Sequence, residues 1–231
     1  MPGRLAIFKD SEFKNDAKDL LTYDSINKVS HHFNIPPSLP IPALLNNGTY
    51  LYTHFGYLPP WAKSKNDFHI NARSESIYEK QTFRDAFKYR RCIIPINGFY
   101  EWQIEDKEKT PYFVRDINKS YLAIAGIWNE YYDASIGANI TTVALITCDA
   151  NDKLMPIHHR MPVILESSDF NTWLKSEDII EINKLLNIYP NQKTKIYPVT
   201  DKINKVEFDE IRAIQEIQIK KDGGEINLFT I

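Results

Sequence analysis

The chain has 231 residues, of which 43% are hydrophobic and 13% aromatic, so it can bury a full core in one large domain or at most two small ones. Lys and Arg number 28 against 30 Asp and Glu, and a net charge of -2 argues neither for nor against binding of nucleic acid, so any basic surface would have to be local. No segment approaches the ~18 apolar residues of a membrane span, and no apolar signal stretch opens the sequence, which predicts a cytoplasmic protein.

In chain order, a helix is expected over 16–23, and the Pro-rich stretch 34–42 (NIPPSLPIP) predicts an ordered loop. Residues rich in β-branched and aromatic types, bounded by turn formers, predict strands over 49–58, 90–96, 111–116, 121–128 and 140–148. Further helices are expected over 82–89, over 168–174 with Ser168 as N-cap, and over 177–186. These elements predict an α+β fold, in which helices decorate a largely antiparallel sheet or partial barrel of a single domain over 1–231.

The two cysteines, Cys92 and Cys148, both lie in apolar runs (CIIPI and VALITC) with no partner motif around them. They read as buried strand residues of a protein in a reducing compartment, without a disulfide.

The chain begins Met1-Pro2-Gly3-Arg4, and the amine of Pro2 is a candidate nucleophile. Loss of Met1, which a small second residue permits, would leave the secondary amine of Pro2 as the N-terminus. An α-amino group titrates near pH ~8, so a useful fraction is uncharged at neutral pH and can attack an aldehyde. The alternative is an ordinary frayed terminus.

The segment HINARSES contains Asn71 and Arg73, whose side chains share one face if the segment is extended. An Asn and an Arg on one face can orient a substrate and hold a phosphate. The alternative is a surface strand with two solvated polar residues.

In RRCIIPINGFYEWQ, an apolar strand runs into Asn97-Gly98, a turn signal, and then into Glu101 between aromatic neighbours. A carboxyl group among aromatic rings is a candidate acid or base, because desolvation raises its pKa toward neutrality. The alternative is a Glu on the solvent face of an edge strand.

In PIHHRMPVIL, two prolines flank His158, His159 and Arg160, which predicts an extended loop before a strand. Adjacent histidines in an extended chain point in opposite directions, and no HxH or HxxxH spacing accompanies them, so we expect no zinc site. One histidine can act as a proton donor; the alternative is a structurally hydrogen-bonded histidine.

In YLPPWAKS, Trp61 follows a Pro pair. It is a candidate platform for an unstacked base, or else a Trp that caps the core beneath a loop.

The chain resembles the SOS response-associated peptidase (SRAP) family, the abasic-site sensors of DNA repair. The resemblance rests on the order and spacing of Gly3-Arg4, the Pro-Pro loop, GYLPPW, INARSE, RRCIIPINGFYEW, ITCDAN and IHHRMPVIL. It runs from Gly3 to about Val206, and NGFYEW combined with HHRMPVIL is highly specific. The tail 220–231 (KKDGGEINLFTI) lies outside the matching motifs.

The resemblance implies a distorted, mostly antiparallel β-barrel core and a positively charged groove for single-stranded DNA. The family chemistry uses a mature N-terminal Cys, whose amine and thiol condense with the ring-opened aldehyde of an abasic site into a thiazolidine crosslink. At the matching positions, Asn71 would orient the nucleophile, Glu101 would assist ring opening and proton transfer, and His158 would act at the sugar hydroxyl as acid or base.

The resemblance also implies the DNA-binding positions and partners. Phosphates would be held by Arg4, Arg73 and Arg160, bases would be wedged by Trp61, and the groove would be lined by Asn34, Pro36 and Pro37. The partner is single-stranded DNA with abasic sites. We expect no cofactor, no metal, no membrane association and a monomer, which is cytoplasmic and associated with the nucleoid when on DNA.

The chain departs from the family pattern at position 2, where Pro2 replaces the Cys. A thiazolidine needs sulfur, so this sequence predicts an iminium-forming lyase, in which the Pro2 nitrogen attacks the aldehyde and promotes β-elimination at the 3′ phosphate. Two alternatives remain: a noncovalent binder of single-stranded DNA with a disarmed site, and a self-processing peptidase that removes Met1.

Overall fold

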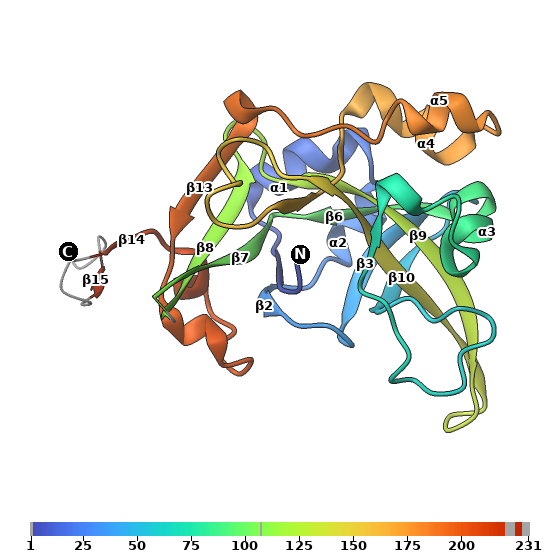
Figure 1. The fold of residues 1–231 in the computed structure, drawn as a ribbon, viewed down its shortest axis with the longest axis horizontal. Helices are drawn as coiled ribbons and strands as arrows, with labels where there is room; N and C mark the ends of the chain where they lie inside the picture. The colour runs from blue at the N-terminus through green and yellow to red at the C-terminus, as the bar shows by residue number, and fades with distance from the viewer. Residues whose placement is uncertain (1, 107, 220–224, 228–231) are drawn as a thin grey trace.

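The computed structural model describes residues 2–106, 108–219 and 225–227. The fold is α+β and a single domain, as predicted, with two large sheets and short helices at their margins (Figure 1). All five predicted strands are present, and the last two are longer than expected, at 12 residues each. The helices and strands are β1 (Leu5–Ile7), α1 (Ser11–Asp16), α2 (Tyr23–Asn27), β2 (His32–Ile35), β3 (Pro40–Leu45), β4 (Tyr50–Phe55), β5 (Asn71–Arg73), α3 (Gln81–Tyr89), β6 (Arg91–Ile96), β7 (Gly98–Glu105), β8 (Glu108–Asp116), β9 (Leu122–Asp133), β10 (Ala138–Asp149), β11 (Arg160–Pro162), β12 (Ile164–Leu165), α4 (Phe170–Lys175), α5 (Ile179–Asn183), β13 (Thr194–Pro198), β14 (Ile217–Ile219) and β15 (Glu225–Asn227).

The larger sheet closes into a five-stranded barrel. Its strands run β10-β4-β3-β6-β9, and β9 pairs back onto β10 to complete the ring. All neighbours in the ring are antiparallel except β4 and β10, which are parallel, so the barrel is mixed and mostly antiparallel. Fully buried side chains such as Ile93, Ile124 and Leu145 fill the core, as expected for β-branched and aliphatic residues facing a closed barrel.

The second sheet has the order β13-β8-β7-β1-β2, and all its pairings are antiparallel. The chain passes from the barrel into this sheet at Asn97-Gly98, between β6 and β7. The sequence indicated a turn at this dipeptide, but β6 and β7 do not pair with each other, so it does not connect a hairpin. Gly98 is required for close packing instead, because a Cβ atom there would lie 2.3 Å from Cζ of Phe113.

The helices are short, and one predicted helix is wrong. Residues 16–23 span the end of α1, a 3-10 turn and the first residue of α2, because side chains at Asp10 and Thr22 cap two separate helices. The helix expected over 82–89 is confirmed as α3. The helix expected over 168–174 begins with a 3-10 turn capped by Glu166 rather than Ser168, and the one expected over 177–186 is the shorter α5.

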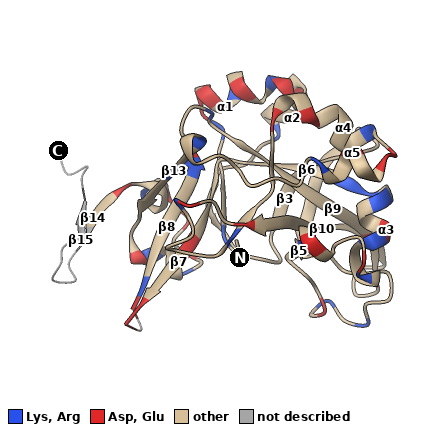
Figure 2. Ribbon diagram, turned by 45° about the horizontal axis from the view of Figure 1, so that its top comes forward, with Lys and Arg blue, Asp and Glu red and all other residues tan. Residues whose placement is uncertain are grey.

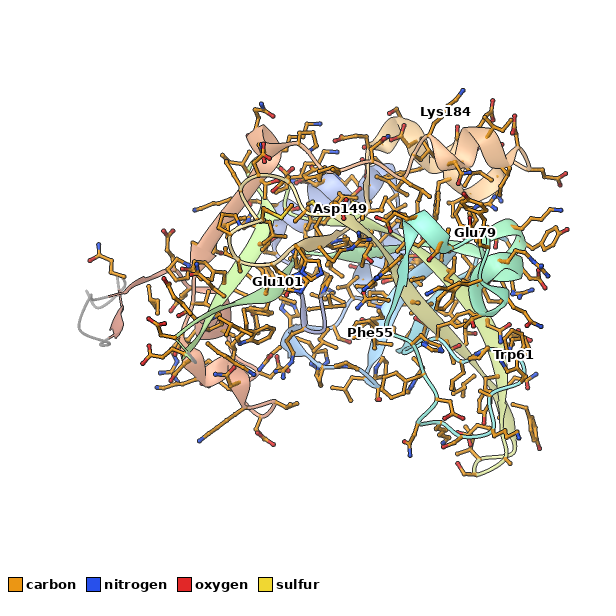
Figure 3. All side chains as sticks on the ribbon, viewed as in Figure 1. Phe55, Trp61, Glu79, Glu101, Asp149 and Lys184 are labelled. Atoms are coloured by element: carbon orange, nitrogen blue, oxygen red, sulfur yellow. The ribbon has the colours of Figure 1, made fainter. Side chains whose placement is uncertain are left out.

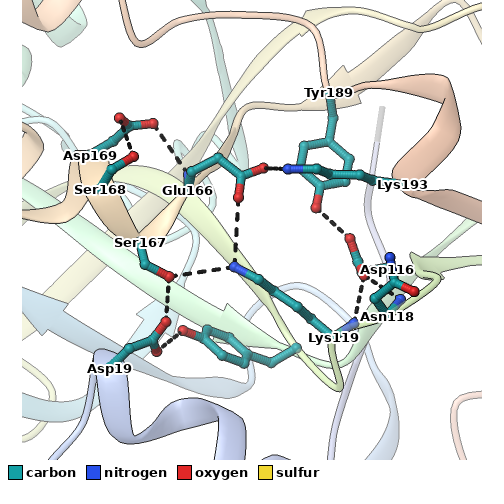
Figure 4. A network of polar contacts seen from close by, with 11 residues as sticks. Asp19, Asp116, Asn118, Lys119, Glu166, Ser167, Ser168, Asp169, Tyr189 and Lys193 are labelled. Carbon is teal, nitrogen blue, oxygen red and sulfur yellow. Dashed lines mark hydrogen bonds and ion pairs between the residues drawn. The ribbon is translucent and has the colours of Figure 1, made fainter.

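A polar network joins the N-terminal helices to distant segments (Figure 4). The carboxylate of Asp19 accepts hydrogen bonds from the hydroxyl groups of Tyr121 and Ser167. Close by, Glu166 pairs with Lys193 at 2.6 Å and with Lys119 at 3.6 Å. These contacts fix the loop before β9 and the segment before β13 against the helical margin of the molecule.

Both cysteines are buried and free, as predicted from their apolar runs. Burial raises the pKa of both thiols, to about 12 for Cys148. Within the described ranges, none of the helices has the length and apolar character needed to cross a membrane. The C-terminal tail, residues 220–231, lies outside the described residues except for β15.

Candidate active site

The N-terminal segment runs along β7 toward Glu101. In the antiparallel register of β1 and β7, Leu5 opposes Phe99 and Ala6 opposes Gly98. The backbone N–H of Tyr100 donates to the carbonyl oxygen of Arg4 at 3.0 Å, which continues the same pairing. The start of the chain therefore lies in the middle of the molecule, beside β7 (Figure 1).

Pro2 is buried, and a side chain from the barrel holds it. Asn71, on β5, donates from Nδ2 to the carbonyl oxygen of Pro2 at 3.2 Å. Its Oδ1 atom is also buried and accepts no hydrogen bond from any described residue. Because β5 pairs in parallel with β10, this amide is fixed to the barrel wall, where it can orient the N-terminal residue.

Glu101 is a buried carboxyl group in the centre of the second sheet. It lies on β7, which pairs with β1 on one side and β8 on the other, and only 3% of the residue is exposed. Burial raises the pKa of Glu101 to about 7. The solvent-face alternative is therefore wrong, because β7 is an interior strand. Figure 3 shows Glu101 close to the N-terminal segment.

His158 lies beside this carboxyl group, with Nδ1 3.8 Å from Oε1 of Glu101. The backbone N–H of Arg160 donates to the same Nδ1 atom at 2.9 Å, and the carbonyl oxygen of Arg160 lies 3.2 Å from it. The shorter contact requires Nδ1 to accept, which favours the tautomer with the proton on Nε2. Burial is the main cause that lowers the pKa of His158 from its usual value. The neutral imidazole is thus favoured.

The two histidines do not point in opposite directions, which corrects the expectation for an extended loop. Residues 152–157 form turns, and the N–H of His158 donates to the carbonyl oxygen of Leu154 at 2.9 Å. The rings of His158 and His159 stack with their centroids 4.6 Å apart. Within the described part of the chain, no three His, Cys, Asp or Glu residues are grouped as a metal site requires.

Arg160 is buried, and carboxylates surround its guanidinium group. Nη1 donates to Glu75 at 2.7 Å and to Asp149 at 2.6 Å, and Nη2 donates to Glu75 at 2.9 Å and to the carbonyl oxygen of Thr147 at 2.7 Å. Glu75 and Asp149 were not singled out from the sequence. Glu75 follows Arg73 by two residues within HINARSES, but nothing in that segment indicates an ion pair with a residue 85 positions away.

The other predicted DNA-binding residues are spread over several surfaces. Arg73 is exposed at the end of β5, and Trp61 is 52% exposed, so Trp61 is not a cap on the core. Arg4 donates to the side chain of Asn34 at 2.7 Å and to the carbonyl oxygen of Ile203 at 2.8 Å. Asn34 is only 2% exposed and donates from Nδ2 to three carbonyl groups in the segment 203–208.

Arg4 and Asn34 thus hold the N-terminal segment, β2 and the 203–208 turn together, and Pro36 and Pro37 follow at the half-buried end of β2. Asn71 contacts Pro2, and His158 lies beside Glu101. Figure 3 shows Trp61 well apart from Glu101. Figure 2 shows acidic and basic residues interspersed over the helical margin.

The protein is a single-domain α+β protein with a mixed five-stranded barrel. The start of its chain lies against an amide, near a buried carboxyl group and an imidazole. The family description "SOS response associated peptidase (SRAP)" matches residues 1–206, and the chain belongs to this family. The resemblance drawn from the sequence motifs is thereby confirmed.

Proteins similar to this chain carry names that agree with one another. Abasic site processing protein YoqW of Bacillus subtilis (strain 168) is 32% identical over 214 residues, which cover 88% of this chain and 94% of that protein. Abasic site processing protein HMCES of Gallus gallus is 28% identical over 71% of this chain and 56% of its own length. The X-ray structure of a protein from Bacteroides thetaiotaomicron shares the fold, with a TM-score of 0.80 at 24% identity over 91% of this chain and 98% of that one.

Proposed function

We propose that the protein processes abasic sites in single-stranded DNA, and that it does so through a covalent adduct of Pro2. The observation that carries this proposal is the position of Pro2, buried against Asn71 on the strand edge that leads to Glu101. Membership of the SRAP family and the names of the similar proteins support the substrate class.

The reaction begins once Pro2 is the N-terminal residue. Its uncharged secondary amine attacks C1′ of the ring-opened sugar, and the carbinolamine loses its hydroxyl group as water, leaving an iminium ion. Removal of a proton from C2′ sends the electron pair into the iminium and gives an enamine. Return of the nitrogen electron pair re-forms the iminium, makes the C2′=C3′ double bond and expels the 3′ phosphate, which completes the β-elimination. Water then hydrolyses the conjugated iminium and releases the Pro2 amine. Without a thiol at position 2, the adduct is transient.

The buried groups supply the proton transfers. With a pKa of about 7, Glu101 exists in both protonation states near neutrality, so it can donate a proton to the departing hydroxyl and accept one from C2′. The Nε2–H of neutral His158 donates to the sugar hydroxyl oxygen, and Asn71 orients the amine. Arg73 and Arg4 are the proposed phosphate positions, and Trp61 is proposed to wedge against the bases. Asn34 is buried and supports this side of the groove through its hydrogen bond with Arg4.

The burial of Glu101 favours catalysis over a disarmed binding module. A carboxyl group that is 3% exposed loses solvation, and its raised pKa shows that the fold disfavours the ionised form. Phosphate contacts and base stacking have no use for such a group, whereas a base or acid poised near neutral pH needs it. General proteolysis lacks a nucleophile here, since both thiols are buried with raised pKa values.

The test uses protein whose N-terminal mass has been verified and single-stranded DNA with one abasic site. We expect strand cleavage and a protein–DNA adduct that borohydride traps and that is absent without reductant. Reductive methylation of the α-amine should abolish both. Unchanged cleavage after that block would overturn the role of Pro2, and binding without cleavage or adduct would support the noncovalent alternative.

A further inference from the structure

We propose that Glu75 is a positioning residue, which holds Arg160 so that the Arg160 peptide fixes the proton of His158 on Nε2. The kinetic part of this inference rests on the proposed function, because it concerns a residue of the same site. The inference assigns Arg160 a partner inside the protein instead of a DNA phosphate.

The hydrogen-bond capacity of Arg160 is the first argument. A guanidinium group has five N–H donors, four of them on Nη1 and Nη2. All four of these have partners: two go to Glu75, one to Asp149 and one to the carbonyl oxygen of Thr147. The fifth donor, on Nε, is buried without a partner among the described residues. A phosphate can therefore reach Arg160 only by displacing a carboxylate.

The two carboxylates hold Arg160 unequally. Glu75 makes a bidentate pair, at 2.7 and 2.9 Å, whereas Asp149 makes one contact and its side chain is 66% exposed. Bidentate pairs of this kind are the strong, geometrically specific ones. The hydrogen bonds from Arg160 hold the pKa of Glu75 below its usual value, so Glu75 is ionised at neutral pH. The side chain of Glu75 is 51% exposed and that of Asp149 is 66% exposed, so the two differ in the second hydrogen bond of Glu75 more than in their access to solvent.

The pair spans three strands. β10 lies between β5 and β11, with Thr147 opposite both Arg73 and Pro162, and Asp149 opposite Arg160. Glu75 sits in the 3-10 turn that follows β5, so its contact with Arg160 ties β11 across β10 to that turn. The peptide N–H of Arg160 is thereby fixed at the start of β11, where it donates to Nδ1 of His158 at 2.9 Å.

The consequence is chemical. Nδ1 accepts from the Arg160 N–H at 2.9 Å, and the Arg160 carbonyl oxygen lies 3.2 Å from the same atom. As long as the shorter contact holds, neutral His158 carries its proton on Nε2 and does not form an N–H···O bond from Nδ1 to Glu101. If β11 shifted, Nδ1 could take the proton and bond to the carboxyl group of Glu101, 3.8 Å away, which would remove the Nε2 donor.

The experiment compares Glu75→Gln with Asp149→Asn, which removes the other carboxylate from the same guanidinium. The first readout is the ¹⁵N NMR signature of the His158 ring in free protein above its titration range. Wild type and Asp149→Asn should show a protonated Nε2 and an unprotonated Nδ1, and Glu75→Gln should show a mixture of tautomers. Protonated Nδ1 in the wild-type protein would overturn the inference even if the Glu75 variant did not fold.

The second readout separates positioning from phosphate binding. For Glu75→Gln we expect an unchanged Kd for single-stranded DNA that carries a stable abasic analogue, and a roughly tenfold slower formation of the borohydride-trapped adduct. If Arg160 is a phosphate ligand masked by Glu75, the same variant should instead bind more tightly and react no slower, and that result would refute the inference. No adduct with wild-type protein would refute the proposed function, and the tautomer measurement would still decide the role of Glu75.

Discussion

Oε1 of Glu101 lies 3.8 Å from Nδ1 of His158, near enough for mutual influence and too far for a hydrogen bond. Burial raises the pKa of the carboxyl group and lowers that of the imidazole. Both shifts favour the uncharged forms, so the site holds a protonated carboxyl and a neutral imidazole through much of the range just below neutrality. Each group keeps its own proton to donate, which suits a reaction that passes through several proton transfers.

The first prediction concerns the pH dependence of stability. The pKa of Glu101 is about 7 in the folded chain and ~4.5 when unfolded, so the folded state binds more protons between these values. The free energy of unfolding should therefore fall as the pH rises through this window, with Glu101 contributing roughly 3 kcal/mol. Glu101→Gln should lack this fall. Chemical denaturation of both proteins at about pH 4.5 and pH 8 measures it.

The matched control is Glu130→Gln on β9, where the residue is exposed. Its unfolding free energy should follow that of the wild type at every pH. A Glu101→Gln variant that parallels the wild type as well would mean that Glu101 ionises normally in the folded protein.

The second prediction concerns Trp61. Because this side chain is 52% exposed, Trp61→Ala should change the free energy of unfolding by no more than about 0.5 kcal/mol. Loss of a stacking platform should weaken binding of single-stranded DNA by about 1 to 3 kcal/mol. Fluorescence anisotropy with a labelled oligonucleotide measures the affinity. Tyr23→Ala on α2, where the ring is 77% exposed, is the control and should bind as the wild type does.

Much of the architecture was predictable from local patterns. The five apolar runs became strands because their β-branched and aromatic side chains pack well on a pleated, partly buried surface. Closure of the barrel was not predictable, because it depends on the parallel contact of β4 with β10, far apart in sequence. The role of Gly98 was not predictable either. The sequence indicates a turn at Asn97-Gly98, whereas in the structure a glycine is needed because a Cβ atom would collide with the ring of Phe113.

The site divides in the same way. Asn71, Glu101 and His158 were identified from unusual polar residues in otherwise apolar segments, and the structure brings them to one place. Glu75 was missed because an ion pair between residues 85 positions apart leaves no trace in either local segment. The stacking of His158 on His159 was also missed, since it follows from a turn held by the carbonyl oxygen of Leu154.

The third prediction concerns the residue at position 2. Pro2→Cys should turn the transient adduct into a crosslink that survives denaturing electrophoresis without borohydride, because the thiol closes a thiazolidine on the initial imine. Pro2→Ala keeps an amine without a thiol and should give an adduct only with borohydride. Intact mass must show that Met1 is removed in each variant. A stable crosslink with Pro2→Ala would point to a nucleophile elsewhere in the chain.

The last prediction separates two neighbours on β5. Asn71→Ala removes the hydrogen bond to the Pro2 carbonyl oxygen, worth about 1 to 1.5 kcal/mol, so adduct formation should slow roughly tenfold with little change in Kd. Arg73→Ala removes an exposed charge and should weaken binding evenly across sequences, lowering the salt dependence by about one ion. Single-turnover rates and salt titrations of Kd measure both effects. Loss of an amide that orients the substrate should lower the rate, whereas loss of a phosphate contact should lower the affinity. Equal losses of rate and affinity in the two variants would therefore mean that β5 acts only as a scaffold.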